Sequence, residues 1–289
     1  MPSSLPRSPA DSPVRRLTPG DLVACADLCE DRGWSRDEHR WGLLLAAGTA
    51  YGMDDPGGKG LMATCVVTSY GSRLAAIGML LVAKRYARQG IGRRLMDHVM
   101  AETGDTPLSL YATSAGRPLY EQLGFTTVGR TERITGILRP TGDRSSTVSV
   151  RPAAAEDLRT LVQLDAEVFG TDRTHVLTRL PAYADHIRVA EDGGDLVGYA
   201  ATWPSAGTQV IGPLIARDTA TARELVTSLA GTTDHPLRTD VDARHSELLD
   251  WFKECGLQFG PTTTLMVRGA LGLPGDWSRR YAPLTVAMG

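Results

Sequence analysis

The stretch with the clearest chemical character is LLVAKRYARQGIGRRLM, residues 80–96. An apolar segment, expected to be a strand, leads through Gly90 and Gly92 into a segment with helical periodicity. Glycines at such a turn let backbone N–H groups approach a ligand closely, and the helix N-terminus adds a positive partial charge. The turn is therefore predicted to bind a pyrophosphate, and a flexible turn with a solvated cationic face is the alternative. Five cations at the turn could pair with phosphate oxygens: Lys84, Arg85, Arg88, Arg93 and Arg94.

A second segment, YATSAGRPLYEQLGF at residues 111–125, is expected to contain a strand end, a short helix and a Leu-Gly-Phe exit. Together the two segments resemble the GNAT N-acetyltransferase superfamily. Its acetyl-CoA motif is Arg/Gln-x-x-Gly-x-Gly/Ala after the fourth strand, and its later signature ends in Leu-Tyr-x-x-Leu-Gly-Phe. The resemblance covers about residues 14–138. The matching residues are Gly90 and Gly92 in the first motif, and Leu119, Tyr120, Leu123, Gly124 and Phe125 in the second.

The chain departs from the family pattern at two positions. Ala87 stands where the family's first Arg or Gln falls, although Arg88 and Gln89 are adjacent substitutes. Thr113 stands where an Asn often opens the second motif. Because the turn would bind phosphate mainly through backbone N–H groups, both departures bear on affinity more than on the site itself.

The resemblance implies how acetyl-CoA would bind. The backbone of the fourth strand would pair with the pantetheine arm and direct an N–H at the thioester carbonyl, where it stabilises the developing oxyanion. An uncharged amine would then attack directly. The residues expected to bind acetyl-CoA are Leu80, Leu81, Val82, Arg88, Gln89, Gly90, Ile91, Gly92, Arg93 and Thr113.

Two residues are candidates for proton transfer. A tyrosine with a pKa near 10 can protonate a departing thiolate with a pKa of about 8.5, and the resemblance favours Tyr120 for that role over a packing aromatic. Glu38 is the candidate general base, with His39 beside it, in the region that lines the acceptor site of similar enzymes. The alternatives there are a surface charge for Glu38, a core role for the flanking Trp34 and Trp41, and a water as the base.

The elements that would position these residues occur twice. The fold expected is α/β, with two tandem GNAT-like domains, each a mixed, mostly antiparallel sheet flanked by helices. The predicted helices near the motifs are 91–103 and 116–123 in the first copy, and 219–230 and 246–255 in the second. The predicted organisation is a disordered leader (1–13), an N-terminal GNAT domain (14–139), a linker (140–147) and a degenerate C-terminal GNAT-like domain (148–289).

The second copy is predicted to have lost the cofactor site. Residues 218–222, DTATA, stand where the glycine turn should be, and an acid there would repel a pyrophosphate. Phe252 falls opposite Tyr120, so the hydroxyl is missing too. The segment from Phe169 to Arg173 resembles a stretch in second domains of tandem GNAT proteins that would line an acceptor pocket, and a helix-capping turn is the alternative. Three roles stay open for the second copy: a scaffold, a wall of the substrate pocket, or the surface of a homodimer.

Composition limits the partners. A net charge of -2 and a pI near 6.3 argue against a nucleic-acid partner. No apolar run approaches the roughly 20 residues that span a bilayer, and the opening MPSSLPRSPADSP lacks the apolar core of a signal peptide, so no membrane partner and a cytoplasmic location are expected. The spacing of the cysteines fits neither a CxxC pair nor a zinc cluster, so no metal is expected: Cys25, Cys29, Cys65 and Cys255.

The function predicted from these residues is transfer of an acetyl group from acetyl-CoA to an amine of a small molecule, with the active site in the N-terminal domain. A longer acyl group or a protein amine is a variant of this reaction. The alternatives are a non-catalytic acyl-CoA-binding or sensory module, suggested by Ala87 and Thr113, and a purely structural protein.

Overall fold

One sheet runs through the whole molecule. The computed structural model describes residues 9–139 and 148–289, so the expected linker and residues 1–8 of the expected leader lie outside it. The described strands form a single 13-stranded sheet in the order β1-β2-β3-β4-β5-β12-β6-β11-β10-β9-β8-β7, with β13 beside β10. In the described ranges, no helix combines the length and apolarity that crossing a lipid bilayer requires.

The two halves present their elements in the same order, which confirms the predicted fold class. The first half contains β1 (Val14–Arg16), α1 (Leu22–Asp31), α2 (Glu38–Ala47), β2 (Thr49–Asp54), β3 (Leu61–Ser69), β4 (Ala75–Val82), α3 (Ile91–Thr103), β5 (Leu108–Ala112), α4 (Arg117–Gln122) and β6 (Thr126–Gly136). The second half contains β7 (Ser149–Pro152), α5 (Leu158–Phe169), α6 (Thr174–Leu177), α7 (Leu180–Tyr183), β8 (His186–Asp192), β9 (Asp195–Ser205), β10 (Thr208–Ala216), α8 (Thr219–Ala230), β11 (Leu237–Asp242), α9 (Ser246–Glu254), β12 (Gln258–Arg268) and β13 (Arg280–Ala282).

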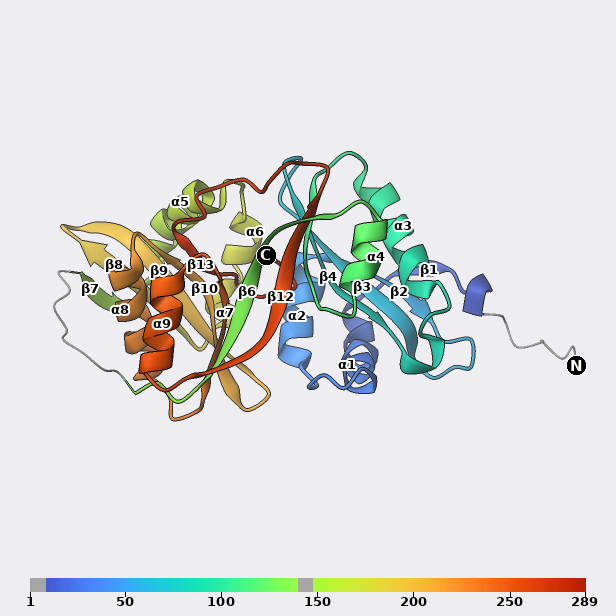
Figure 1. The fold of residues 1–289 in the computed structure, drawn as a ribbon, viewed down its shortest axis with the longest axis horizontal. Helices are drawn as coiled ribbons and strands as arrows, with labels where there is room; N and C mark the ends of the chain where they lie inside the picture. The colour runs from blue at the N-terminus through green and yellow to red at the C-terminus, as the bar shows by residue number, and fades with distance from the viewer. Residues whose placement is uncertain (1–8, 140–147) are drawn as a thin grey trace, which may run out of the picture.

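The last strands of the two halves are exchanged. β12 pairs with β5 of the first half on one side and with β6 on the other, and β6 pairs in turn with β11 of the second half. Figure 1 shows green β6 and red-orange β12 side by side at the centre of the molecule. Each half therefore completes its sheet with a strand from the other, an arrangement not expected from the sequence.

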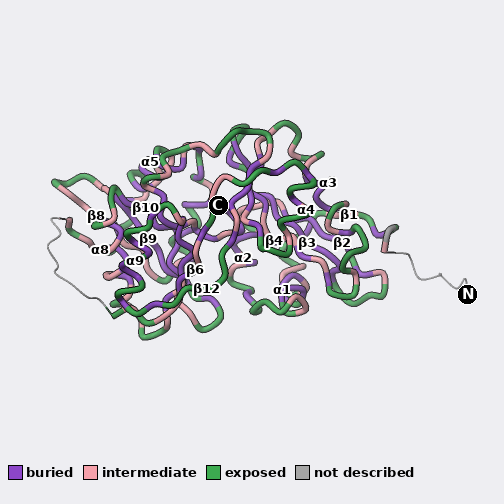
Figure 2. Tube along the Cα trace, in the orientation of Figure 1, coloured by how far each residue is buried: buried purple, intermediate pink, exposed green. Residues whose placement is uncertain are grey.

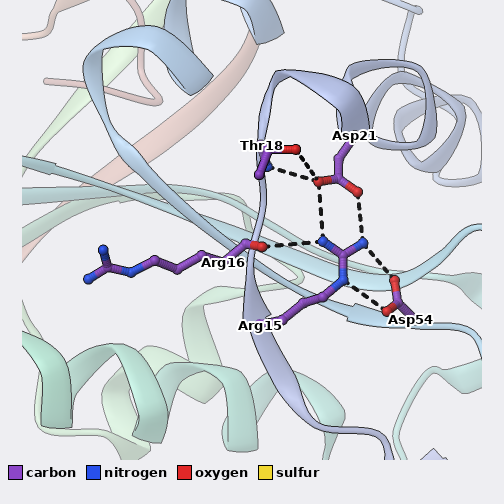
Figure 3. A network of polar contacts seen from close by, with 5 residues as sticks. All are labelled: Arg15, Arg16, Thr18, Asp21 and Asp54. Carbon is purple, nitrogen blue, oxygen red and sulfur yellow. Dashed lines mark hydrogen bonds and ion pairs between the residues drawn. The ribbon is translucent and has the colours of Figure 1, made fainter.

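Each half begins with a matching ion-pair network, and Figure 3 shows the one in the first half. The guanidinium of Arg15 in β1 donates to Asp21 six residues later (2.7 and 3.2 Å) and to Asp54 at the end of β2 (2.8 Å). In the second half, Arg151 in β7 donates to Asp157 six residues later (2.6 and 2.8 Å), and its second acidic partner is a carboxylate on β8 (2.6 Å). This recurrence supports an origin of the two halves by duplication.

Three cores hold the layers together. One lies between the β2–β5 region and α3 with α4, and another lies under α8 and α9 in the second half. The third joins α1 and α2 to α5, α6 and α7, so the inner faces of the two halves share one apolar core. Figure 2 shows the buried segments meeting between the halves. The second half is thus packed directly against the helices that precede β2.

Candidate active site

An opening lies between β4 and β5, called here the β4–β5 splay. The two parallel strands pair only where residues 75–77 meet residues 108–110, and β4 then continues to Val82 without a partner on that side. The other edge of β5 remains paired with β12 as far as Ala112. The predicted cofactor-binding residues Leu80, Leu81 and Val82 lie on the free edge of β4.

A β-bulge interrupts β4 at the start of this free edge. Thr64 pairs with Leu81 but Val66 pairs with Gly78, so β4 carries one extra residue at this point. Met79 has a φ of 52°, and the hydroxyl of Thr64 donates to its carbonyl oxygen (3.0 Å). A bulge leaves backbone groups unpaired and turns them away from the ladder. This is where an N–H aimed at a thioester carbonyl is predicted.

The turn after β4 presents backbone N–H groups. Arg88 and Gly90 have left-handed φ values of 61° and 77°, and no side chain caps α3. The first helical hydrogen bond of α3 runs from the N–H of Arg94 to the carbonyl of Gly90 (3.0 Å), so the N–H groups of residues 91–93 have no acceptor within the helix. Successive N–H groups in such a turn form an anion-binding concavity.

The two glycines serve this turn differently. A Cβ at Gly90 would meet nothing within 4 Å, so its positive φ is what favours glycine there. A Cβ at Gly92 would lie 3.5 Å from Val82 and 3.6 Å from Leu119. A bulky side chain at Gly92 would therefore enter the space between the end of β4 and α4, beside the splay.

Some of the side chains predicted to bind phosphate oxygens already contact other groups of the protein. Arg85 is ion-paired with buried Asp55, which also accepts a hydrogen bond from the hydroxyl of Tyr86 (2.8 Å). Arg93 donates to Gln122 in α4 (2.8 Å). The amide of Gln89 donates to the backbone carbonyl of residue 85 (3.0 Å). The charge of Arg85 is thus already balanced, whereas the exposed Arg88 remains a candidate for binding phosphate oxygens.

Tyr120 lies in α4, within the core that α3 and α4 share with the sheet. It is 8% exposed, and its ring meets Phe125 edge to face at 5.9 Å. Burial raises the pKa of its hydroxyl well above the ordinary value, which keeps the proton in place at neutral pH. The hydroxyl forms no hydrogen bond with any residue in the described ranges. The hydroxyl of Thr113 accepts from the N–H of Gly116 (3.2 Å) in the turn before α4. The residue at the Asn position of the family pattern therefore stabilises this turn.

Glu38 and His39 lie on the other face of the sheet, at the start of α2. Glu38 is ion-paired with Arg36 (2.6 Å), and His39 stacks on Tyr183 of the second half at 4.3 Å and donates through Nε2 to its carbonyl oxygen (2.8 Å). Trp41 is fully buried, which agrees with the alternative that it is a core residue. The structure thus places Tyr120 and Glu38 on opposite faces, and their roles remain predictions.

A cavity of about 310 Å³, called here the outer cavity, lies beside Glu38 and His39. Its other wall is the hairpin between β9 and β10, so both halves of the chain line it. Sequence reasoning named Glu38 and His39 but missed the hairpin, because no local pattern links residues so far apart in the chain. Its lining residues are Arg36, Asp37, Glu38, His39, Pro204, Ser205, Ala206, Gly207, Thr208, Gln209 and His235.

The equivalent of the splay in the second half is filled by the chain itself. β10 and β11 pair in parallel only at residues 209–210 and 237–238, and β13 then pairs with β10 through Ala282 and Arg280. A Cβ at Gly212 would lie 2.4 Å from the carbonyl oxygen of Pro283, so this packing is close. β13 was not expected from the sequence, and among the described residues of the first half no strand corresponds to it.

In the second half, Asp218 stands at the position equivalent to the glycine turn. The carboxylate of Asp218 caps α8 by accepting from the N–H and the hydroxyl of Thr221 (both 2.8 Å), so a negative charge sits where a phosphate would bind. Phe252 is fully buried in the core. In the segment predicted to line an acceptor pocket or to form a helix-capping turn, Asp172 accepts from the N–H of residue 174, the first residue of α6 (2.7 Å). Buried Arg173, the residue before α6, pairs with Asp165 (2.5 and 2.9 Å). These contacts favour a turn at the start of a helix.

Comparisons with known proteins agree with this geometry. Two family models, both described as acetyltransferase (GNAT) domains, match residues 64–139 and 161–282 and together cover well over half of the chain. The N-acetyltransferase YitH of Bacillus subtilis (strain 168), described as uncharacterized, is 29% identical over 232 residues, which are 79% of this chain and 82% of YitH.

Solved structures show the same fold over nearly the whole chain. A Pyrococcus horikoshii protein described as an acetyltransferase has a TM-score of 0.81 at 19% identity, covering 96% of this chain and 95% of its own. A tandem GNAT protein from the clavulanic acid biosynthesis pathway has a TM-score of 0.65 at 12% identity, covering 91% of this chain and 100% of its own.

The bulged and splayed strand, the uncapped helix and the two matching domain models define the class of this protein as an N-acetyltransferase. Within that class, the chain belongs to the GNAT superfamily and is a tandem GNAT protein. Enzymes of this superfamily use acetyl-CoA as co-substrate.

Proposed function

We propose that the N-terminal half transfers an acetyl group from acetyl-CoA to an amine of a small molecule. The observation that carries this proposal is the meeting of three features at the end of β4: the splay, the bulge at Met79 and the uncapped N-terminus of α3. Each offers unpaired backbone groups to a different part of the co-substrate. The second half keeps an equivalent bulge in β10, between Ile211 and Leu214, but β13 pairs along β10 beyond it and Asp218 caps the helix that follows.

The residues present fit acetyl-CoA. The N–H groups of residues 91–93, with Arg88 beside them, would bind the pyrophosphate. The free edge of β4 would pair with the pantetheine arm, and the bulge would direct an N–H at the thioester oxygen, where negative charge develops during attack.

The chemistry then requires two proton transfers. The amine nitrogen forms a bond to the acetyl carbon, the carbon–sulfur bond breaks, and Tyr120 donates its proton to the departing thiolate. The attacking amine loses a proton to Glu38, to His39 or to water. The outer cavity is lined by Glu38 and His39, and it is the proposed entry for the acceptor.

Release of free thiol from acetyl-CoA tests this function. With a panel of small primary amines, we expect thiol to be released at a rate that saturates with both substrates. The alternative, a non-catalytic acyl-CoA-binding module, would bind CoA tightly and release no thiol with any amine. A chain that neither binds CoA nor releases thiol would refute the proposal in both forms.

A further inference from the structure

Three guanidinium groups converge between the two halves. Arg40 comes from α2, Arg133 from β6 and Arg238 from β11, and they are called here the arginine cluster. Together with Asp240 and Trp203, they line a narrow inner cavity. The chain after β13 closes its remaining side, through residues 283–286. Two halves of the chain thus bring like charges together in one partly enclosed space.

The hydrogen bonds of the arginine cluster are incomplete. Arg133 is satisfied by Asp240, to which it donates from Nε and Nη2 (2.9 and 3.3 Å). The Nε of Arg40 is buried 3.7 Å from the nearest oxygen of Asp37, too far for a hydrogen bond. The Nε of Arg238 is also buried and bonds to no atom of the described residues. Two carboxylates therefore face three cations, and two buried N–H donors lack acceptors.

An arrangement of this kind is unfavourable unless something else supplies the acceptors. A buried charged donor without a partner costs more than a neutral one, because it has lost its water. Loss of water, together with the positive charges of Arg133 and Arg40, holds the pKa of Arg238 below its ordinary value. A bound anion would supply both the missing charge and the missing acceptors.

The arginine cluster adjoins the outer cavity. On α2, residues 36–39 line the outer cavity and Arg40 lines the inner one. On β10, Gln209 lines the outer cavity, while the next residue, Val210, pairs with Arg238 and lines the inner one. The inner cavity has room for about 10 Å³, roughly one water, so an anion would bind where the two cavities meet, with only its oxygens reaching inward.

We propose that the arginine cluster binds an anionic group of the acceptor, so that the acceptor is an amine that also carries a carboxylate or a phosphate. This inference rests on the proposed function and specifies its substrate class. Arg40 and Arg238 donate to the anion, and Arg133 holds Asp240 in place. The guanidinium fork suits carboxylate and phosphate oxygens equally, so the shared chemistry is an oxyanion.

Binding of matched amines tests the inference. The probes are 4-aminobutyrate, 3-aminopropyl phosphate and n-butylamine. Each is titrated calorimetrically into the full chain with CoA present, so that CoA already occupies the turn before α3. We expect one or both acids to bind at least about tenfold more tightly than n-butylamine, since charge-assisted hydrogen bonds are the strong ones. The acid that binds more tightly identifies the anion.

Variants locate the effect. Arg238→Gln and Arg40→Gln should each remove most of the tenfold preference, and Arg238→Lys should keep part of it. Arg217→Gln is the matched control, because Arg217 is exposed and pairs with Asp192 (2.7 Å) on the outside of the second half. Melting temperatures show whether each variant is folded.

Equal binding of acids and n-butylamine to the wild type would overturn the inference, as would a preference that both glutamine variants retain. The CoA titration tests the proposed function separately. If CoA binds and the acids show no preference, only the inference fails. If CoA does not bind, the proposed function fails, and the acceptor role of the arginine cluster fails with it.

Discussion

At the scale of single residues, Tyr120 combines burial with a hydroxyl that no described neighbour holds. Burial raises the pKa of this hydroxyl, so it carries its proton at neutral pH, although it is a weaker acid than an exposed tyrosine. The proton that it carries is the one proposed to reach a thiolate that forms in the splay. Replacement by phenylalanine keeps the ring and its contact with Phe125. We therefore expect Tyr120→Phe to lower kcat by about 100-fold with little change in the KM for acetyl-CoA.

Steady-state kinetics of thiol release measure this effect. Tyr51→Phe is the matched control, because Tyr51 lies in the same core and its hydroxyl interacts with Glu102 (3.4 Å) and Arg16, two residues that the reaction does not use. Its kcat should stay close to that of the wild type. If Tyr120→Phe were equally active, the proton would have to come from another group.

The residues that sequence predicts well are those whose role depends on local backbone shape. Gly90 shows the expected left-handed φ, and Asp218 caps its helix in place of a phosphate. Side-chain partners were harder, because they depend on contacts across the fold. Nothing near Arg85 in the sequence shows that Asp55 balances its charge, and nothing near Arg238 shows that Arg40 lies close to it.

At the scale of elements, the ion pair between β1 and the turn before α1 should govern part of the acid stability. Hydrogen bonds from Arg15 lower the pKa of Asp21 to about 2, from an unfolded value near 3.9. The pair therefore stabilises the fold above about pH 4, and this contribution is lost as the pH falls towards 2. Because Arg15 is partly exposed, we expect a contribution of about 1 kcal/mol at neutral pH.

Asp21→Asn tests this contribution through urea unfolding at several pH values. The variant should be less stable than the wild type at pH 7, and the two should converge near pH 2. Asp250→Asn is the control, since Asp250 is exposed and pairs only with Lys253 in the same helix (2.8 Å). A constant difference at every pH would mean that the ionisation of Asp21 is not the cause.

Element order was the part of the fold most accessible from sequence. Helical periodicity and glycine turns predicted α3, α4, α8 and α9 to within a residue or two, because those signals are local. No local signal predicts that β12 lies beside β5. Both β6 and β12 have the residue alternation that a strand beside β5 requires, so the pattern does not distinguish them. β13 is three residues long, too short for any periodicity to show.

At the scale of the whole molecule, the exchanged strands should make the two halves inseparable under native conditions. β12 lies between β5 and β6, and β6 also pairs with β11, so separating the halves would break three strand ladders and expose the shared core. We expect a chain cut by a protease at a site engineered into residues 140–147 to remain one complex.

Native mass spectrometry of the cut chain would show it. The two fragments should travel together at neutral pH and separate only in denaturant. The uncut chain carrying the same engineered site is the control for effects of the insertion. Fragments that separate without denaturant would contradict the strand exchange.

The central claim is that the chain has one CoA site, formed by the turn before α3. Calorimetric titration of CoA tests it most directly, with Gly92→Trp to fill the space beside Val82 and Leu119, and Ala220→Trp as the matched change at an exposed position of α8. We predict one CoA per wild-type chain, binding weakened by about 100-fold in Gly92→Trp, and unchanged binding in Ala220→Trp. Two CoA molecules per chain, or a loss of binding in Ala220→Trp alone, would contradict the claim.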